Sequence, residues 1–144
     1  SGGADGVRVW DLSRTIAGHR ELLRDGGPVV RALAASDAGH LLAADDSGVV
    51  EVWSLDEQLR ARPLRLLRHP RSVRAVAVTP DGARAVTGCR DGVVRLWDLA
   101  AGEEVDRIDL SPTRDRPDAL AVSPDGREVL VGTSRGVVMH FVAR

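Results

Sequence analysis

Short apolar runs alternate with polar turns along the whole chain, and one block of this kind recurs several times. A block holds a run of small apolar residues, a turn rich in Asp and Gly, a second apolar run, another Gly turn, and a third run that ends near an aromatic residue. Short runs bounded by Gly, Asp and Pro are typical of β-strands joined as an antiparallel meander. The first runs lie at 30–36, 73–79 and 117–123, the second at 41–44, 84–88 and 129–132, and the third at 5–12, 47–55, 91–99 and 135–142.

The aromatic residues set the period of the repeat. Trp10, Trp53, Trp97 and Phe141 follow one another at steps of 43, 44 and 44 residues, and all three tryptophans of the chain are in this register. A weaker fourth strand is expected after the third run, and Pro63 within it is compatible with an edge strand. A period of about 40–45 residues is typical of the four-stranded blades of a β-propeller. The sequence therefore predicts an all-β fold made of such blades.

The chain is short for a closed propeller. Closed rings have about four to eight blades, whereas a chain of this length and period gives about three to three and a half four-stranded blades. We expect one partial propeller that begins inside a blade, at an artificial or proteolytic boundary, and ends after a third strand. The expected units are an incomplete first blade at 1–24, two blades at 25–68 and 69–110, and an incomplete last blade at 111–144.

These blocks resemble the repeats of the WD-repeat (WD40) family, over essentially the whole chain and most closely in residues 69–110. The resemblance implies a WD40-type β-propeller and a structural tetrad formed by His69, Thr87, Asp91 and Trp97. In this tetrad the Asp would hold the His, the His would bond the Thr hydroxyl, and the hydroxyl would reach the indole N–H. Buried polar groups need partners of this kind.

The other copies of the block depart from that pattern, so we expect one blade only to carry the full network. The second copy lacks the His and the Thr, and the last copy has Phe141 in place of the Trp. The residues at the His, Thr and Asp positions are Gly26, Ala43 and Ser47 in the second copy and Thr113, Val131 and Arg135 in the last.

The basic side chains apart from His are all Arg, 20 in number, and the chain has no Lys, Asn or Tyr. Codons for the three missing residues are rich in A and T, which indicates a GC-rich, actinobacterium-like bacterial source. The Arg excess is therefore not interpreted as selection for nucleic-acid binding, and the formal net charge of −1 gives no global attraction for polyanions. Because every aromatic residue is assigned to a blade, stacking on single-stranded nucleic acid is not favoured either.

The single cysteine, Cys89, can form no internal disulfide, which fits a reducing cytoplasm. A buried and inert thiol is the simplest interpretation of this residue. No apolar run approaches the roughly 18 residues of a membrane span, so no membrane partner is expected.

No arrangement of residues predicts catalysis or cofactor binding. The four histidines show no metal-ligand spacing, and a P-loop needs a Lys that the chain lacks. We therefore expect no enzyme activity, no cofactor and no metal. The weaker alternative is a hydrolase of the propeller type, for which Arg31, Arg74 and Asp118 would face the central channel.

Loops in such a fold gather at two ends, and the repeat assigns each loop to one of them. The loops before the first strands and the turns before the third strands share one end, where the last two blades carry several arginines. Because the guanidinium fork fits carboxylate and phosphate groups, an acidic or phosphorylated segment could dock there; an ordinary solvated rim is the alternative. The candidate partner-binding residues are Arg68, Arg71, Arg90, Arg114, Arg116 and Arg135.

The predicted function is that of a non-catalytic protein–protein interaction or scaffold module, a propeller fragment of a larger protein such as a signalling protein. Its partners would be a protein or peptide and the remaining blades of the same propeller. The alternative is a self-assembling half-propeller, in which two copies close a ring of about seven blades as a homodimer.

Overall fold

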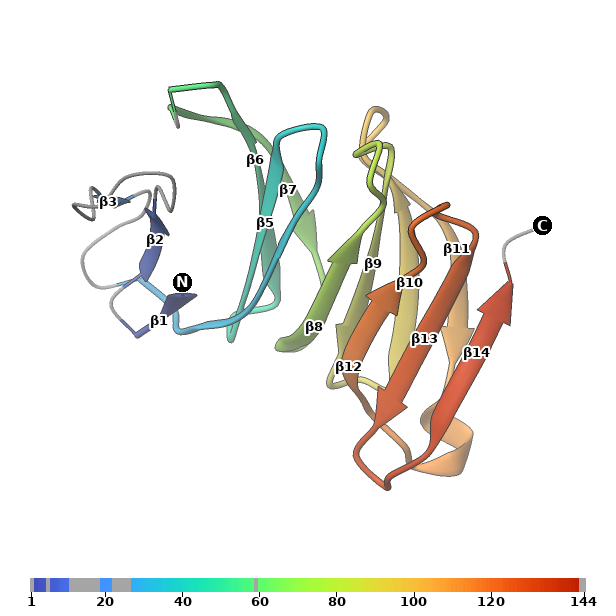
Figure 1. Ribbon diagram of the computed structural model, residues 1–144. Helices are drawn as coiled ribbons and strands as arrows, with labels where there is room; N and C mark the ends of the chain where they lie inside the picture. Colours follow the sequence, from blue (N-terminus) through green and yellow to red (C-terminus); the bar gives the residue numbers. More distant parts are fainter. Residues whose placement is uncertain (1, 5, 11–18, 22–26, 59, 143–144) are drawn as a thin grey trace.

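The computed structural model describes residues 2–4, 6–10, 19–21, 27–58 and 60–142. Figure 1 shows four antiparallel sheets that stand side by side in chain order. Each of the two middle sheets has four strands, and the first and last sheets have three strands each among the described residues. Apart from one 3-10 turn, η1 (Ser111–Thr113), every described element is a β-strand. The predicted all-β architecture of a partial β-propeller is therefore confirmed.

Within each sheet the strands pair in chain order, and the first strands of successive sheets, β4, β8 and β12, lie next to one another. The first sheet contains β1 (Gly2–Gly3), β2 (Gly6–Trp10) and β3 (His19–Glu21), and the second contains β4 (Val30–Ala35), β5 (His40–Asp45), β6 (Val49–Leu55) and β7 (Ala61–Arg68). The third contains β8 (Val73–Val78), β9 (Arg84–Cys89), β10 (Val93–Asp98) and β11 (Glu103–Asp109), and the last contains β12 (Pro117–Val122), β13 (Glu128–Thr133) and β14 (Val138–Val142).

The turn between β8 and β9 shows how the sequence ends its strands. The hydroxyl of Thr79 donates to the carboxylate of Asp81 at 2.6 Å, and that carboxylate also accepts the amide of Ala83 at 2.9 Å. Gly82 has a φ of 70°, a left-handed conformation that favours glycine. Side-chain bonds from Asp and Thr thus replace the strand ladder at the point where the chain reverses.

The apolar core forms layers between neighbouring sheets. The largest layer lies between the second and third sheets and contains Leu42, Leu67 and Trp97. A second layer joins the third sheet to the last one, where Val86 lies in the same cluster as Phe141. Burial contributes roughly 1.5–3 kcal/mol for each such side chain. Each blade is therefore stabilised mainly by the blades stacked against it.

The last sheet has one covered face and one open face. Leu130 and Val138 lie on the open face, where they are 46% and 71% exposed. Their counterparts in the third sheet, Val86 and Val94, are only 3% and 2% exposed because the last sheet covers them. The exposed apolar residues of the open face are therefore equivalent, in the repeat, to residues that are buried in the preceding blade.

A β-bulge occurs at the same place in each of the three inner strands. The register shifts between Val30 and Ala32 in β4, and at the equivalent points of β8 and β12. A bulge leaves one residue outside the ladder and turns its side chain in a new direction. The bulged residues are Arg31, Arg74 and Asp118, all exposed at the inner strands.

Candidate functional site

Because the strands alternate in direction, the loops separate into two rims. The lower rim in Figure 1 carries η1, the turn between β13 and β14, the loop from β7 to β8 and the turn between β9 and β10. We call it the arginine rim. All six candidate partner-binding residues lie on it and are exposed: Arg68, Arg71, Arg90, Arg114, Arg116 and Arg135.

Those six guanidinium groups are largely free of protein partners. Among the described residues, none of the six forms an ion pair, and Arg135 alone makes a side-chain hydrogen bond, from Nη1 to the carbonyl of Thr113 at 3.1 Å. Arg114 follows η1 with a φ of 58°, a left-handed conformation uncommon for a residue with a side chain. The rim therefore offers several unneutralised cations.

Two acidic residues of the same rim, Asp45 and Asp115, are turned inward. The carboxylate of Asp45 accepts the hydroxyl of Ser47 at 2.7 Å and the amide of Val49 at 3.0 Å. Asp115 is buried, and it accepts the amide of Arg116 at 3.1 Å and the hydroxyl of Ser134 at 3.3 Å. These carboxylates shape the turns and neutralise little of the arginine charge outside.

Three of the four residues proposed as a structural tetrad form one hydrogen-bonded chain. Nε2 of His69 lies 2.8 Å from Oγ1 of Thr87, and Nε1 of Trp97 donates to the same oxygen at 2.9 Å. Nδ1 of His69 lies 3.2 Å from the carbonyl oxygen of Gly48 in the neighbouring blade. A carbonyl can only accept, so Nδ1 carries the proton and Nε2 accepts from the Thr hydroxyl. These hydrogen bonds therefore link the second and third blades.

Asp91 is placed differently from the expectation. Its carboxylate accepts from both Nη1 and Nη2 of Arg95, at 3.3 and 2.6 Å, and from the amide of Val93 at 3.0 Å. The physical reason is the burial of Arg95, whose side chain is 8% exposed and needs counter-charges, which Asp91 and Glu104 supply. Burial opposes ionisation of Asp91, but the bonds from Arg95 and Val93 still hold the pKa of Asp91 below its usual value. The carbonyl of Gly48 takes the place of the Asp as the partner of His69.

The second sheet lacks this network, and its tryptophan shows the consequence. Ala43 stands where the third sheet has Thr87, because Ala43 pairs with Glu51 as Thr87 pairs with Arg95. Among the described residues, Nε1 of Trp53 is the single buried side-chain N or O atom without a hydrogen-bond partner. The missing hydroxyl thus leaves an indole N–H unsatisfied.

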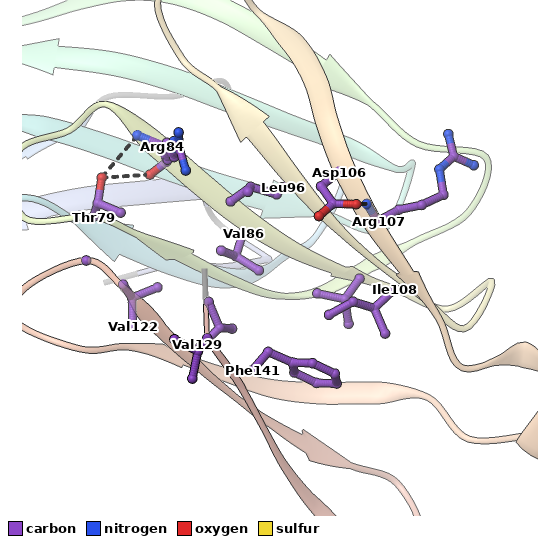
Figure 2. Close-up of a pocket in the computed structure, with 13 residues that line it drawn as sticks. Thr79, Arg84, Val86, Leu96, Asp106, Arg107, Ile108, Val122, Val129 and Phe141 are labelled. Atoms are coloured by element: carbon purple, nitrogen blue, oxygen red, sulfur yellow. Dashed lines mark hydrogen bonds between the residues drawn. The ribbon is translucent and has the colours of Figure 1, made fainter. Parts of the chain in front are cut away.

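A cavity of about 100 Å³ lies between the third sheet and the last one. Figure 2 shows Val86, Leu96 and Ile108 facing Val129 and Phe141 across it. The lining is mostly apolar, with Asp106, Arg107 and Arg84 at its margins, and the hydroxyl of Thr79 in it is bonded to Asp81.

The Gly-x-Ser-x-Gly pattern of a nucleophile elbow occurs once, at 132–136, and is not among the sites predicted from the sequence. It lies at the turn between two strands, β13 and β14, instead of a turn from strand to helix. The hydroxyl of Ser134 donates to Asp115, and no described His bonds it. The pattern here is that of a hairpin turn.

No group of three or more His, Cys, Asp or Glu side chains among the described residues could hold a metal ion. No helix in the described part of the chain is long and apolar enough to cross a membrane. Burial raises the pKa of the Cys89 thiol, whose Sγ lies 3.2 Å from the carbonyl oxygen of Arg71.

Comparison with known proteins places one segment in a described family. Residues 61–98, from β7 to β10, match the family described as "WD domain, G-beta repeat". A search of curated proteins gives no match for the chain. Repeats of this family generally form non-catalytic interaction domains. The matched segment and the stacked blades together support a WD-repeat family and a protein-interaction module for this chain.

Proposed function

We propose that this chain is a non-catalytic scaffold module whose arginine rim docks an acidic or phosphorylated segment of a partner protein. The observation that carries the proposal is the division of charge on that rim. Asp45 and Asp115 are bonded into turns, and Asp46 is paired with Arg31, whereas the six candidate arginines are exposed and form no ion pair with described residues. An anionic partner would supply the missing counter-charges.

The energetics of such docking depend on several contacts acting together. One exposed ion pair is worth only about 0–1 kcal/mol, so a single arginine gives little affinity. Several guanidinium groups on one rim raise the local concentration of an anionic segment, and each fork can make two parallel bonds to a carboxylate or phosphate. Binding should therefore weaken as salt is added, because exposed charges are screened.

A triple variant tests this proposal. Arg71, Arg90 and Arg114 are changed to Ala, and binding of fluorescent glutamate-rich and phosphoserine-containing peptides is followed by anisotropy at two salt concentrations. The matched control removes the same charge from the opposite rim by changing Arg62, Arg84 and Arg127 to Ala. The proposal predicts weaker binding for the rim variant and near-native binding for the control. Equal affinity in all three proteins would refute it.

A second candidate function is supported by the open face of the last sheet. Leu130 and Val138 are exposed there, at positions where the third sheet is covered by a further blade. We propose that a second copy of the chain covers this face and helps to close a ring as a homodimer. Light scattering during size exclusion tests it: a discrete dimer is expected, and Val138→Glu should shift it to monomer. A native monomer at all concentrations would instead favour coverage by the remaining blades of a parent chain.

We propose a cytoplasmic location in a GC-rich bacterium, within a larger signalling protein; the lone, buried Cys89 supports a reducing compartment. Recovery of the complete gene from its source genome tests this setting directly. A secretory leader or a source with an AT-rich genome would contradict it.

A further inference from the structure

At the junction between the second and third sheets, beside the inner strands, the chain holds one of its own carboxylates, that of Asp46. Asp46 follows β5, and its two carboxylate oxygens accept from Nε and Nη2 of Arg31 at 2.5 and 2.7 Å. The hydroxyl of Ser72, from the next blade, donates to Asp46 at 3.3 Å. Arg31 lowers the pKa of Asp46 most, and the positive charge of Arg74 lowers it further. We call these four residues the first socket.

The first socket depends on the bulges in the inner strands. Arg31 and Arg74 are the bulged residues of β4 and β8, so both side chains leave the ladder; Arg31 bonds Asp46, and Arg74 acts on Asp46 through its charge alone. The pair formed by Arg31 and Asp46 is partly exposed, with side chains 44% and 36% accessible. A carboxylate is therefore held there in contact with solvent.

The next junction, between the third and last sheets, is built in the same way. The amide of Asp46 donates to the carbonyl of Val29 at 3.1 Å, and one blade later the amide of Arg90 donates to the carbonyl of Ser72 at 2.9 Å. The bulge of β12 also repeats those of β4 and β8. The residues equivalent to the first socket can therefore be assigned one by one. Arg74 corresponds to Arg31 and Arg90 to Asp46. Arg116 corresponds to Ser72 and Asp118 to Arg74, and we call these four residues the second socket.

The second socket holds an arginine where the first holds its carboxylate. Arg74 keeps the role of Arg31, but Arg90 replaces Asp46 and Arg116 replaces Ser72. All three guanidinium groups are exposed, and none forms an ion pair with a described residue. Like charges held on one rim repel one another, and an anion between them would relieve that repulsion.

We propose that the second socket binds the carboxylate of a Glu or Asp side chain presented by a partner protein. This inference rests on the proposed function of the arginine rim and names its central contact. The first socket shows that Arg31, the counterpart of Arg74, holds a carboxylate at the end of the inner strand. The partner's carboxylate takes the place that Asp46 fills one blade earlier.

Asp118 favours a carboxylate over a phosphate. It stands where the first socket has Arg74, so one side of the second socket is negative. A phosphoserine carries about −1.5 to −2 charges at neutral pH, and its second charge would meet this Asp. A carboxylate with one charge needs only the fork of Arg74 and the neighbouring arginines.

A charge transplant tests the proposal. The double variant Arg90→Asp/Arg116→Ser gives the second socket the Asp and the Ser of the first, leaves Asp118 in place, and supplies an acid of the chain itself to Arg74. The control, Arg71→Asp/Arg114→Asn, makes the same change in charge elsewhere on the rim, and Asn tolerates the left-handed backbone at position 114. Three peptides with a common sequence serve as probes, with Glu, Gln or phosphoserine at one central position.

The native chain should bind the Glu peptide about tenfold more tightly than the Gln peptide, as for a charged bond that one partner loses. The transplanted variant should lose that discrimination, whereas the control should keep it at lower overall affinity. Equal discrimination in both variants, or a preference for phosphoserine over Glu, would overturn the proposal while leaving the rim as the docking surface. No binding of any acidic peptide to the native chain would overturn both. Arg74→Gln, which adds no acid, gives a second route to the same loss if the transplant fails to fold.

Discussion

Oγ1 of Thr87 accepts a hydrogen bond from Nε1 of Trp97 at 2.9 Å, between neighbouring strands of the third sheet. The hydroxyl is fully buried and also bonds Nε2 of His69, whose other ring nitrogen reaches the second sheet. One hydroxyl thus satisfies two ring nitrogens in the layer that joins two blades. Removal of the hydroxyl should therefore lower the free energy of unfolding more than removal of the methyl group of Thr87.

Thr87→Val is expected to destabilise the chain by about 1–3 kcal/mol, because the buried indole N–H of Trp97 loses its acceptor while the shape of the side chain is kept. Urea unfolding followed by tryptophan fluorescence measures the change. Thr87→Ser is the matched control, because it keeps the hydroxyl and should cost less than the Val variant. Equal losses for the two variants would show that packing of the methyl group, not the hydrogen bond, is what matters.

The block pattern predicts the strands well, because turn chemistry and apolar runs are local properties. The resemblance to WD repeats implies a network of His69, Thr87 and Trp97, and these three residues are joined by hydrogen bonds. The partner of Asp91 could not be predicted, because the sequence does not tell which arginine is buried; Arg95 lies in a strand like any outward-facing residue. The burial of Arg95, not the position of Asp91, decides that pairing.

The two sockets beside the inner strands could not be predicted from the sequence either. Arg31 and Asp46 are 15 residues apart, and their contact depends on a bulge that adds one residue to an apolar run. A run of small apolar residues reads the same with or without such an irregularity. Arg31, Arg74 and Asp118 could be assigned to the inner strands, but their role beside a carboxylate needs the register of the sheet.

The unsatisfied indole of Trp53 gives a prediction in the stabilising direction. Ala43→Ser introduces a hydroxyl at the position equivalent to Thr87, and it should raise the free energy of unfolding by about 0.5–1.5 kcal/mol by giving Nε1 an acceptor. Ala44→Ser is the control, since Ala44 is just as deeply buried but lies on the other face of β5. The midpoint temperature of thermal unfolding should rise for Ala43→Ser and fall for Ala44→Ser. A loss of stability in both would mean that Trp53 cannot reach a hydroxyl at position 43.

Stability should depend on pH through His69. Burial lowers the pKa of this ring below its ordinary value of 6.5, more than its bond to Gly48 raises it. The unfolded chain therefore takes up the proton first as the pH falls. The stabilising effect of the neutral ring is complete above about pH 6.5 and is lost as the pH drops from there toward the lower pKa of the folded state.

Urea unfolding between pH 8 and 5 measures this effect, with a slope of at most about 1.4 kcal/mol per pH unit from one group. His69→Gln should be less stable at pH 8 but should lack this slope. Carboxylates such as Asp91, whose pKa is lowered, add a separate loss at more acidic pH. A slope that is the same in both proteins would assign the effect to other groups.

Gly48 links the second blade to the loop that carries His69. Its φ is 91°, and a Cβ there would lie 2.7 Å from the carbonyl oxygens of both His69 and Arg71. These are backbone atoms of the arginine rim, so Gly48→Ala has to move the loop as well as adopt a left-handed backbone, which itself costs about 1–2 kcal/mol. The expected loss is therefore larger than that for the backbone conformation alone.

Gly136→Ala is the matched control, because it measures the loss of stability that comes from the left-handed backbone alone. Gly136 has a similar φ of 80°, but a Cβ there meets nothing within 4 Å. Its substitution should cost only about 1–2 kcal/mol, and the excess for Gly48→Ala reports the strain passed to the loop between β7 and β8. Because that loop carries Arg71 of the arginine rim, the Gly48 variant should also bind acidic peptides more weakly than the Gly136 variant. Equal stability and equal binding for the two variants would show that the junction yields at no cost, and that Gly48 does not set the position of the rim.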